Sequence, residues 1–98
     1  MVVVRNIFQL KFGKAREARD LWKEASAMMR KHGLPETRLL TDLTGQYYTL
    51  VAESSYESLS AYEEGTRKES GLAEFKAWYQ KLVPLVESGR RELFSVVD

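Results

Sequence analysis

The sequence contains no cysteine, only two prolines and a single histidine among its 98 residues. Without cysteine the protein forms no disulfide bond and has neither a thiolate nucleophile nor a thiolate metal ligand. No apolar run approaches the roughly 20 residues that a membrane-spanning helix needs, so we expect no membrane partner. The first residues, MVVVRN, also lack the apolar core of a signal peptide, and we therefore expect a cytoplasmic protein.

The charges are nearly balanced, with 15 basic and 14 acidic side chains and a net charge of +1. A field this weak does not support non-specific binding to nucleic acid, and we expect no nucleic-acid partner. Charged residues make up 30% and hydrophobic residues 44% of the chain, as in ordinary globular proteins. We expect residues 1–98 to fold as a single domain that buries about 60–65% of its unfolded surface and gains stability from a partner subunit.

Residues 2–12, VVVRNIFQLKF, alternate as in a half-buried β-strand. Val4, Asn6, Phe8 and Leu10 share one face of this strand, so Asn6 places an amide among apolar side chains. Two interpretations follow from the hydrogen-bonding capacity of an amide. It bonds a neighbouring backbone group or a buried water, or it faces a bound ligand.

Apolar spacing and turn residues divide the rest of the chain into further helices and strands. In order, we expect a strand at 2–12, a helix at 14–33, two strands within 37–54, a helical region from 54 to 84 that breaks near Gly71, and a strand within 90–98. Gly33 ends the first helix, and Gly45 allows a tight hairpin turn with a two-residue loop. That hairpin puts these residues on its core face: Leu39, Thr41, Leu43, Tyr48, Leu50 and Ala52. Ser54 and Glu57 have the spacing of a capping box at the start of the second helix.

The order strand, helix, strand, strand, helix, strand predicts an α+β fold, because right-handed crossovers place both helical regions on one side of a single antiparallel sheet. This is the ferredoxin-like βαββαβ arrangement, which leaves the other sheet face open. On the open face we expect Val3, Ile7, Leu40, Tyr47, Val51 and either Leu93 or Val97, among Arg5, Arg38 and Glu53. Burying roughly 400 Å² of such a face contributes on the order of 10 kcal/mol before association costs, so we expect a homodimer through it.

Four segments resemble a known group of proteins: the first strand RNIFQLKFG, a long helix ending in RKHG, a strand YYTLVAE and a helix EFKAWYQKL. On these segments the whole chain resembles the dimeric α+β barrel superfamily, and within it the small antibiotic-biosynthesis-monooxygenase-like and NIPSNAP-like proteins. The resemblance implies two sheets packed face to face across a two-fold axis. It also implies a ligand cleft between each sheet and its helices.

Six residues are candidates for that cleft. We expect Asn6 and Tyr79 to be catalytic, and the ligand-binding residues to be Phe8, Tyr48, Tyr62 and Trp78. Their aromatic rings suit a flat apolar ligand, and the Asn6 amide suits a carbonyl or hydroxyl group. The alternative is that Trp78 and Tyr79 are ordinary core aromatics on a helix with apolar periodicity.

Some members of the superfamily oxidise polycyclic phenolic substrates without metal or flavin. The resemblance therefore implies a monooxygenase of small aromatic substrates that needs no cofactor. Such a reaction requires an apolar slot for the substrate and polar side chains that promote its deprotonation. The alternative function is a non-catalytic module for ligand binding or dimerisation.

Haem-degrading members of the superfamily combine an asparagine in the first strand with a tryptophan and an iron-binding histidine. Asn6 matches that pattern by position, but Tyr79 stands where the histidine is expected and Tyr62 near the expected tryptophan. Because no imidazole remains at the iron position, we expect neither haem degradation nor a haem cofactor.

Two further classes of site are disfavoured by residue type. His32, the only histidine, stands in the last turn of the first helix, where it serves as a cap, and no second histidine is available for a metal site. The segments VVVRNIF and GQYYTLV superficially resemble the sheet motifs of RNA-recognition domains. Only Tyr47 among the expected outward residues could stack a base, so we do not expect RNA binding.

Overall fold

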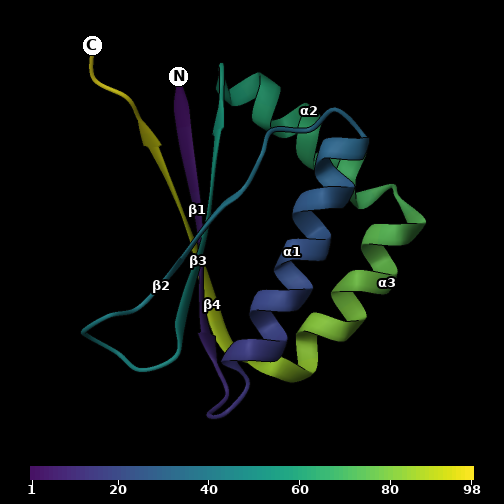
Figure 1. Ribbon diagram of the computed structural model, residues 1–98. Helices are drawn as coiled ribbons and strands as arrows, with labels where there is room; N and C mark the ends of the chain where they lie inside the picture. Colours follow the sequence, from purple (N-terminus) through teal and green to yellow (C-terminus); the bar gives the residue numbers. More distant parts are fainter.

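The computed structural model describes residues 1–98, which form a four-stranded antiparallel sheet and three α-helices (Figure 1). In chain order the elements are β1 (Val2–Leu10), α1 (Ala15–Lys31), β2 (Arg38–Thr41), β3 (Thr49–Tyr56), α2 (Leu59–Ser70), α3 (Ala73–Leu82), the short 3₁₀ helix η1 (Val83–Leu85) and β4 (Val86–Ser95). The strands lie in the order β2, β3, β1, β4. The predicted ferredoxin-like α+β fold is confirmed.

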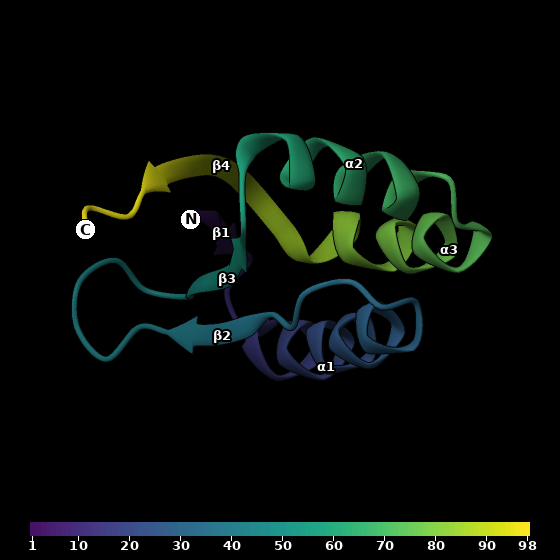
Figure 2. The ribbon, with the colours of Figure 1, turned by 90° about the horizontal axis from the view of Figure 1, so that it is seen from above.

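All three helices cover the same face of the sheet, and the opposite face is open (Figure 1). Seen from above, α1 lies on the β2 side of the molecule, whereas α2 and α3 lie on the β4 side (Figure 2). None of the helices combines the length and the apolar composition that crossing a membrane requires.

The register of β1 determines which of its side chains face the helices. On β3, Ser54 pairs with Val4, Ala52 with Asn6 and Leu50 with Phe8. Val4, Leu50 and Ala52 are buried on the helix side, as the alternation of residues 2–12 predicts. Asn6 therefore lies on the helix-facing side of a central strand.

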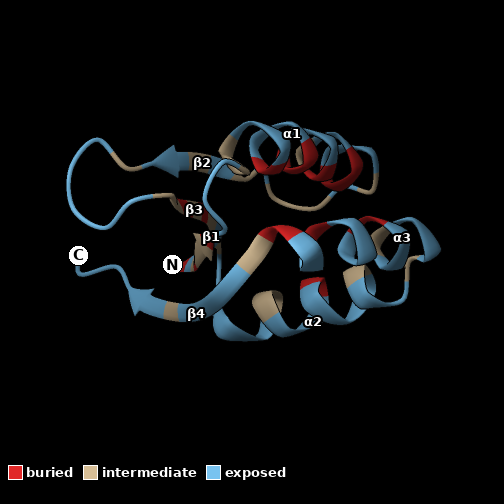
Figure 3. Ribbon diagram, turned by 90° about the horizontal axis from the view of Figure 1, so that it is seen from below, coloured by how far each residue is buried: buried red, intermediate tan, exposed pale blue.

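The core lies between the sheet, α1 and α3, and the buried residues of α1 form one stripe along the helix (Figure 3). Trp22 from α1 and Trp78 from α3 meet edge to face, with 4.7 Å between their ring centroids. The indole N–H of Trp78 donates a hydrogen bond of 2.6 Å to the backbone oxygen of Leu21. These two contacts join α3 to α1 and fix the wall that faces β1.

The hairpin between β2 and β3 keeps its predicted faces, but its loop is longer than predicted. Thr41 pairs with Leu50, and residues 42–48 form the connection. An even number of residues lies between Thr41 and Leu50, as in a hairpin with a two-residue loop, so the same residues of both strands face the core. Leu43, predicted for the core face, lies in the loop and is 98% exposed.

The predicted start of the second helix and the predicted start of the last strand are wrong, because β3 ends later and β4 begins earlier than predicted. Strand β3 continues to Tyr56, so Ser54 belongs to the strand, and α2 is capped instead by Ser58, whose Oγ accepts a hydrogen bond from the backbone N–H of Ala61. Strand β4 begins at Val86 rather than near residue 90. The break near Gly71 is confirmed, because α2 ends at Ser70 and α3 begins two residues after Gly71.

The open face carries two neighbouring rows of side chains that cross the strands. Leu40, Val51 and Ile7 pair with one another across β2, β3 and β1 and form an apolar row. The next row alternates in charge and consists of Arg38, Glu53, Arg5 and Glu92. Glu53 accepts hydrogen bonds of 2.7 Å from both Arg5 and Arg38.

Three residues predicted for this face lie elsewhere. Tyr47 belongs to the loop before β3. Leu93 pairs with Val4 and so shares the helix-facing side, while Val97 follows the end of β4. On β4 the side chain that points to the open face beside Val3 is Phe94. Phe94 is 47% exposed and has the Arg5 guanidinium 5.3 Å from its ring centroid.

Candidate functional site

A cavity of about 310 Å³ lies between the sheet and the helices. Its floor comes from β1, β3 and β4, and its walls come from all three α-helices. The lining residues are Val4, Asn6, Phe8, Trp22, Met29, Thr37, Ala52, Ser54, Tyr56, Tyr62, Thr66, Glu69, Phe75, Trp78, Tyr79, Leu82 and Arg91. A volume at the lower end of the roughly 300–1,000 Å³ of ligand pockets suits a small molecule.

One part of the lining is a continuous set of aromatic rings. Phe8 lies 5.5 Å from Trp22, which meets Trp78, and Trp78 lies 5.5 Å from Phe75. Phe75 in turn stacks on Tyr79 at 6.2 Å. The indole N–H of Trp22 is the only buried side-chain polar atom of the protein without a hydrogen-bond partner. This aromatic wall offers flat apolar surfaces to a flat ligand.

Polar side chains at the middle of the cavity come from neighbouring strands. Arg91 on β4 pairs directly with Asn6 on β1, so both side chains rise from the same level of the sheet. The guanidinium of Arg91 donates a hydrogen bond of 2.8 Å to the hydroxyl of Tyr62 on α2. The Asn6 amide makes no hydrogen bond to another protein group, and its donors and acceptor face the cavity unpaired.

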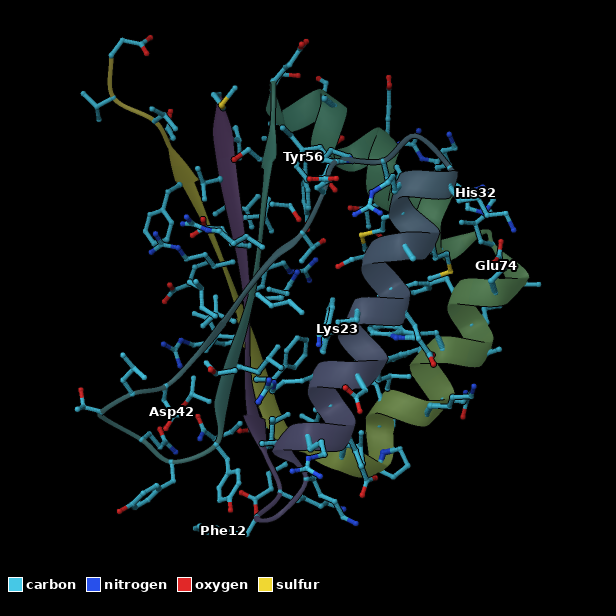
Figure 4. The ribbon with its side chains drawn as sticks, viewed as in Figure 1. Phe12, Lys23, His32, Asp42, Tyr56 and Glu74 are labelled. Carbon is cyan, nitrogen blue, oxygen red and sulfur yellow. The ribbon has the colours of Figure 1, made fainter.

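A second polar region lies toward the end of the molecule where Tyr56 is found (Figure 4). Its ring lies edge to face with Tyr62 at 5.3 Å and against Gly65, where a Cβ atom would be 3.0 Å from the Tyr56 ring. Burial raises the pKa of the Glu69 carboxyl, which has no hydrogen bond or ion pair within the protein. Burial also raises the pKa of Tyr56, and the negative charge of Glu69 adds to that effect.

The cavity has an opening at the edge strand β4. A shallower hollow beside β4 shares four residues with the cavity: Asn6, Phe8, Tyr79 and Arg91. Ser88 and Gly89 continue the rim of this hollow along β4. Asn6 therefore lies where the hollow and the cavity meet.

Five of the six residues predicted for the cleft line this one cavity: Asn6, Phe8, Tyr62, Trp78 and Tyr79. Tyr48 does not. It precedes β3 with a positive φ of 57°, and its ring meets Phe12 edge to face at 4.9 Å, away from the cavity. Tyr48 packs against the core next to Leu10, whose N–H donates a hydrogen bond to the Tyr48 backbone oxygen, and this is beyond Phe8, the last residue of β1 in the lining.

Arg91, Tyr56 and Glu69 are among the polar lining residues that were not predicted from the sequence. Arg91 was missed because the sides of β4 were assigned the other way round: Leu93 was expected on the open face, but it and Arg91 both share the helix-facing side. Tyr56 lies in the part of β3 that was assigned to a helix. Glu69 was not singled out, although Tyr62, Thr66 and Glu69 have the i, i+4, i+7 spacing of one helix face.

The single histidine lies outside the cavity. His32 follows α1, and its Nε2 atom lies 2.7 Å from Oε1 of Glu74 on α3, as the labelled pair in Figure 4 shows. This contact and the hydrogen bond from Lys68 to the His32 backbone oxygen tie the end of α1 to α2 and α3. No group of three or more histidine, cysteine or acidic side chains gathers anywhere in the structure.

The fold can be compared with known proteins. No protein-family model and no curated relative matches the chain. An uncharacterized NIPSNAP domain protein from Burkholderia xenovorans superposes with a TM-score of 0.87 at 15% identity, covering 99% of this chain and 95% of its own. A NIPSNAP family protein from Agrobacterium tumefaciens superposes with a TM-score of 0.87 at 20% identity, covering 99% of this chain and 93% of its own.

A second group of similar structures consists of antibiotic biosynthesis monooxygenases. An antibiotic biosynthesis monooxygenase superposes with a TM-score of 0.78 at 15% identity, and the match covers 100% of both chains. Both groups agree with the resemblance inferred from the sequence. The chain therefore has the ferredoxin-like α+β fold of the NIPSNAP and antibiotic biosynthesis monooxygenase proteins.

Proposed function

We propose that the cavity binds a small, flat aromatic molecule that carries a carbonyl or hydroxyl group. The observation that carries the proposal is the Asn6 amide, which is unpaired and faces a cavity with a continuous set of aromatic rings along one part of its lining. Because the amide makes no hydrogen bond within the protein and is only partly buried, both its donor and its acceptor groups are free to bond a ligand. The aromatic wall provides the apolar contact area, and Asn6 sets the orientation of the ligand's oxygen.

We further propose that the protein is a monooxygenase that acts on such a molecule without a cofactor. For an anthrone-like substrate, a methylene carbon beside the rings gives a proton to water, and the resulting carbanion reacts with dioxygen to a peroxide anion, which takes up a proton to become a hydroperoxide. Loss of water then leaves a carbonyl, so one oxygen atom enters the substrate and the other leaves as water. Asn6, by donating to the substrate oxygen, stabilises the enolate that forms in the first step. The structural likeness to an antibiotic biosynthesis monooxygenase supports this reaction class.

Oxygen uptake with anthrone tests the reaction. The wild-type protein is expected to accelerate uptake, and Asn6→Ala to slow it at least tenfold, because the oxyanion loses its donor. Gln80→Ala is the matched control, since Gln80 is exposed on α3 and does not line the cavity. Binding of anthrone without oxygen uptake would instead identify a non-catalytic ligand-binding module.

A second copy of the chain is the partner that we propose for the open sheet face. Ile7 is already buried in the single chain, but Leu40 and Phe94 are 39% and 47% exposed on this face, and Phe94 lies beside Val3 on the far side of the charged row. The neighbouring row reads positive, negative, positive, negative from Arg38 to Glu92. A copy related by a two-fold axis across this row presents the reversed order, so each charge meets its opposite.

A further inference from the structure

The cavity has a second polar region that the proposed function does not use. Tyr56 pairs with Val2 on β1, four residues along the strand from Asn6. At about 3.3 Å per residue, the two levels of the sheet are about 13 Å apart. Glu69 and Tyr56 therefore lie toward one end of the cavity, and Asn6 and Arg91 lie near its middle.

Glu69 is the one carboxylate among the residues that line the cavity. It projects from the same face of α2 as Tyr62 and Thr66, and it is partly shielded from solvent. The other ionisable lining groups are Tyr56 on β3, Tyr62 on α2, Tyr79 on α3 and Arg91 on β4. The only cation among them, Arg91, donates to Tyr62, and none of them is within hydrogen-bond distance of the Glu69 carboxylate.

We propose that Glu69 and Tyr56 form a second recognition site for the ligand. This site accepts a hydrogen bond from a phenolic hydroxyl at the end of the ligand opposite the end that contacts Asn6. The inference rests on the proposed function and narrows its ligand class to aromatic molecules with oxygen functions at both ends. A carboxylate accepts from a phenol more strongly than a neutral acceptor does. The Tyr56 hydroxyl beside it offers a second hydrogen-bonding group to the same ligand oxygen.

Three naphthols test the proposal by geometry. 2-Naphthol has one hydroxyl, 2,6-dihydroxynaphthalene has hydroxyls at opposite ends, and 2,3-dihydroxynaphthalene has both at one end. Both tryptophans of the chain, Trp22 and Trp78, line the cavity, so quenching of tryptophan fluorescence measures the dissociation constants. We expect the 2,6-diol to bind roughly tenfold more tightly than 2-naphthol, and the 2,3-diol to show no such gain.

The ratio of the dissociation constants of 2-naphthol and the 2,6-diol, measured in variants, then tests whether Glu69 binds the second hydroxyl. Glu69→Gln is expected to bring the ratio close to one, because an amide lacks the charge that strengthens the bond. Glu63→Gln is the matched control on the same helix, since Glu63 is exposed and does not line the cavity, and it should keep the wild-type ratio.

The proposal is overturned if wild-type protein shows no gain for the 2,6-diol, or if the gain persists in Glu69→Gln. Tight 2-naphthol binding with no gain would refute only the second recognition site and leave the proposed function standing. Absence of binding for all three naphthols would refute both. The comparison of the 2,6-diol with the 2,3-diol needs no variant and is therefore independent of any effect of substitution on folding.

Discussion

The ring of Phe8 lies directly over Gly89, its partner on the neighbouring strand β4. A Cβ atom at Gly89 would be 3.0 Å from Cδ1 of Phe8, which is tighter than most Cβ contacts in proteins, so the ring would have to shift. The missing side chain lets the ring lie against the edge strand, where it forms part of the cavity floor and of the opening beside β4. The shape of the cavity therefore depends on a glycine that contributes no side chain to it.

Gly89→Ala is predicted to push the Phe8 ring toward the cavity and to weaken 2-naphthol binding at least tenfold. The crowding should destabilise the fold by about 1 kcal/mol, which thermal unfolding would measure. Gly71→Ala is the matched control, because a Cβ there meets only ordinary contacts at 3.5 Å or more, and Gly71 does not line the cavity. Unchanged naphthol affinity in Gly89→Ala would show that Phe8 does not shape the binding site.

Glu69→Gln is predicted to raise the thermal stability at pH 7 by a few degrees. Burial raises the pKa of Glu69 above its unfolded value of 4.5, so the folded state binds this proton more tightly than the unfolded state. Stability therefore increases as the pH falls from above the folded pKa toward 4.5, and ionised Glu69 costs stability at neutral pH. The melting temperatures of wild type and Glu69→Gln should converge below pH 4.5. An advantage for the variant that persists at that pH would contradict this explanation.

Val51→Glu is predicted to weaken self-association at least tenfold. Val51 is the middle member of the apolar row on the open face, and a second copy would bury the new carboxylate against apolar side chains. Sedimentation velocity over a dilution series measures the effect. Lys23→Glu on the exposed side of α1 serves as the control for added negative charge. A wild-type protein that sediments as a monomer at every concentration would refute the proposed dimer.

Glu53 is predicted to stabilise the fold at neutral pH but not in acid. The hydrogen bond from Arg5, the hydrogen bond from Arg38 and the positive charges of both arginines lower the pKa of Glu53 below its usual 4.5, despite the opposing effect of burial. Its stabilising contribution is complete above pH 4.5 and is lost as the pH falls through the lowered folded-state pKa. Glu53→Gln should therefore melt below the wild type at pH 7, with the gap closing in acid. An equal gap at every pH would mean that the effect comes from packing rather than charge.

Strand periodicity was sufficient to place the central residues of the site. The alternation of residues 2–12 put Asn6 and Phe8 on the helix side, and burial of Val4 and Leu10 on that side follows from the same period. The helical spacing of residues 72–86 likewise placed Trp78 and Tyr79. Both inferences needed only the local period and the side of the sheet that the helices cover.

Local periodicity could not predict residues whose place in the structure depends on where a strand begins or ends. Tyr48 packs against the core, as the alternation predicts, but it lies outside the cavity, because the alternation gives the side of the sheet and not the extent of the cavity along it. Ser54 and Ser58 both fit a helix cap, and only pairing of β3 with β1 as far as Tyr56 selects Ser58. Arg91 and Glu69 enter the cavity through tertiary packing of β4 and α2, which local propensity does not encode.

The most direct test of the binding site uses the side-chain amide of Asn6, the only asparagine in the chain. Its NH₂ group gives one pair of signals in a ¹H–¹⁵N correlation spectrum, which Asn6→Ala identifies by their loss. Titration with 2-naphthol is predicted to shift these signals saturably, together with the indole N–H signals of Trp22 and Trp78. Saturable shifts confined to residues outside the cavity, or no shift of the Asn6 signals at saturating naphthol, would contradict the assignment of this cavity as the ligand site.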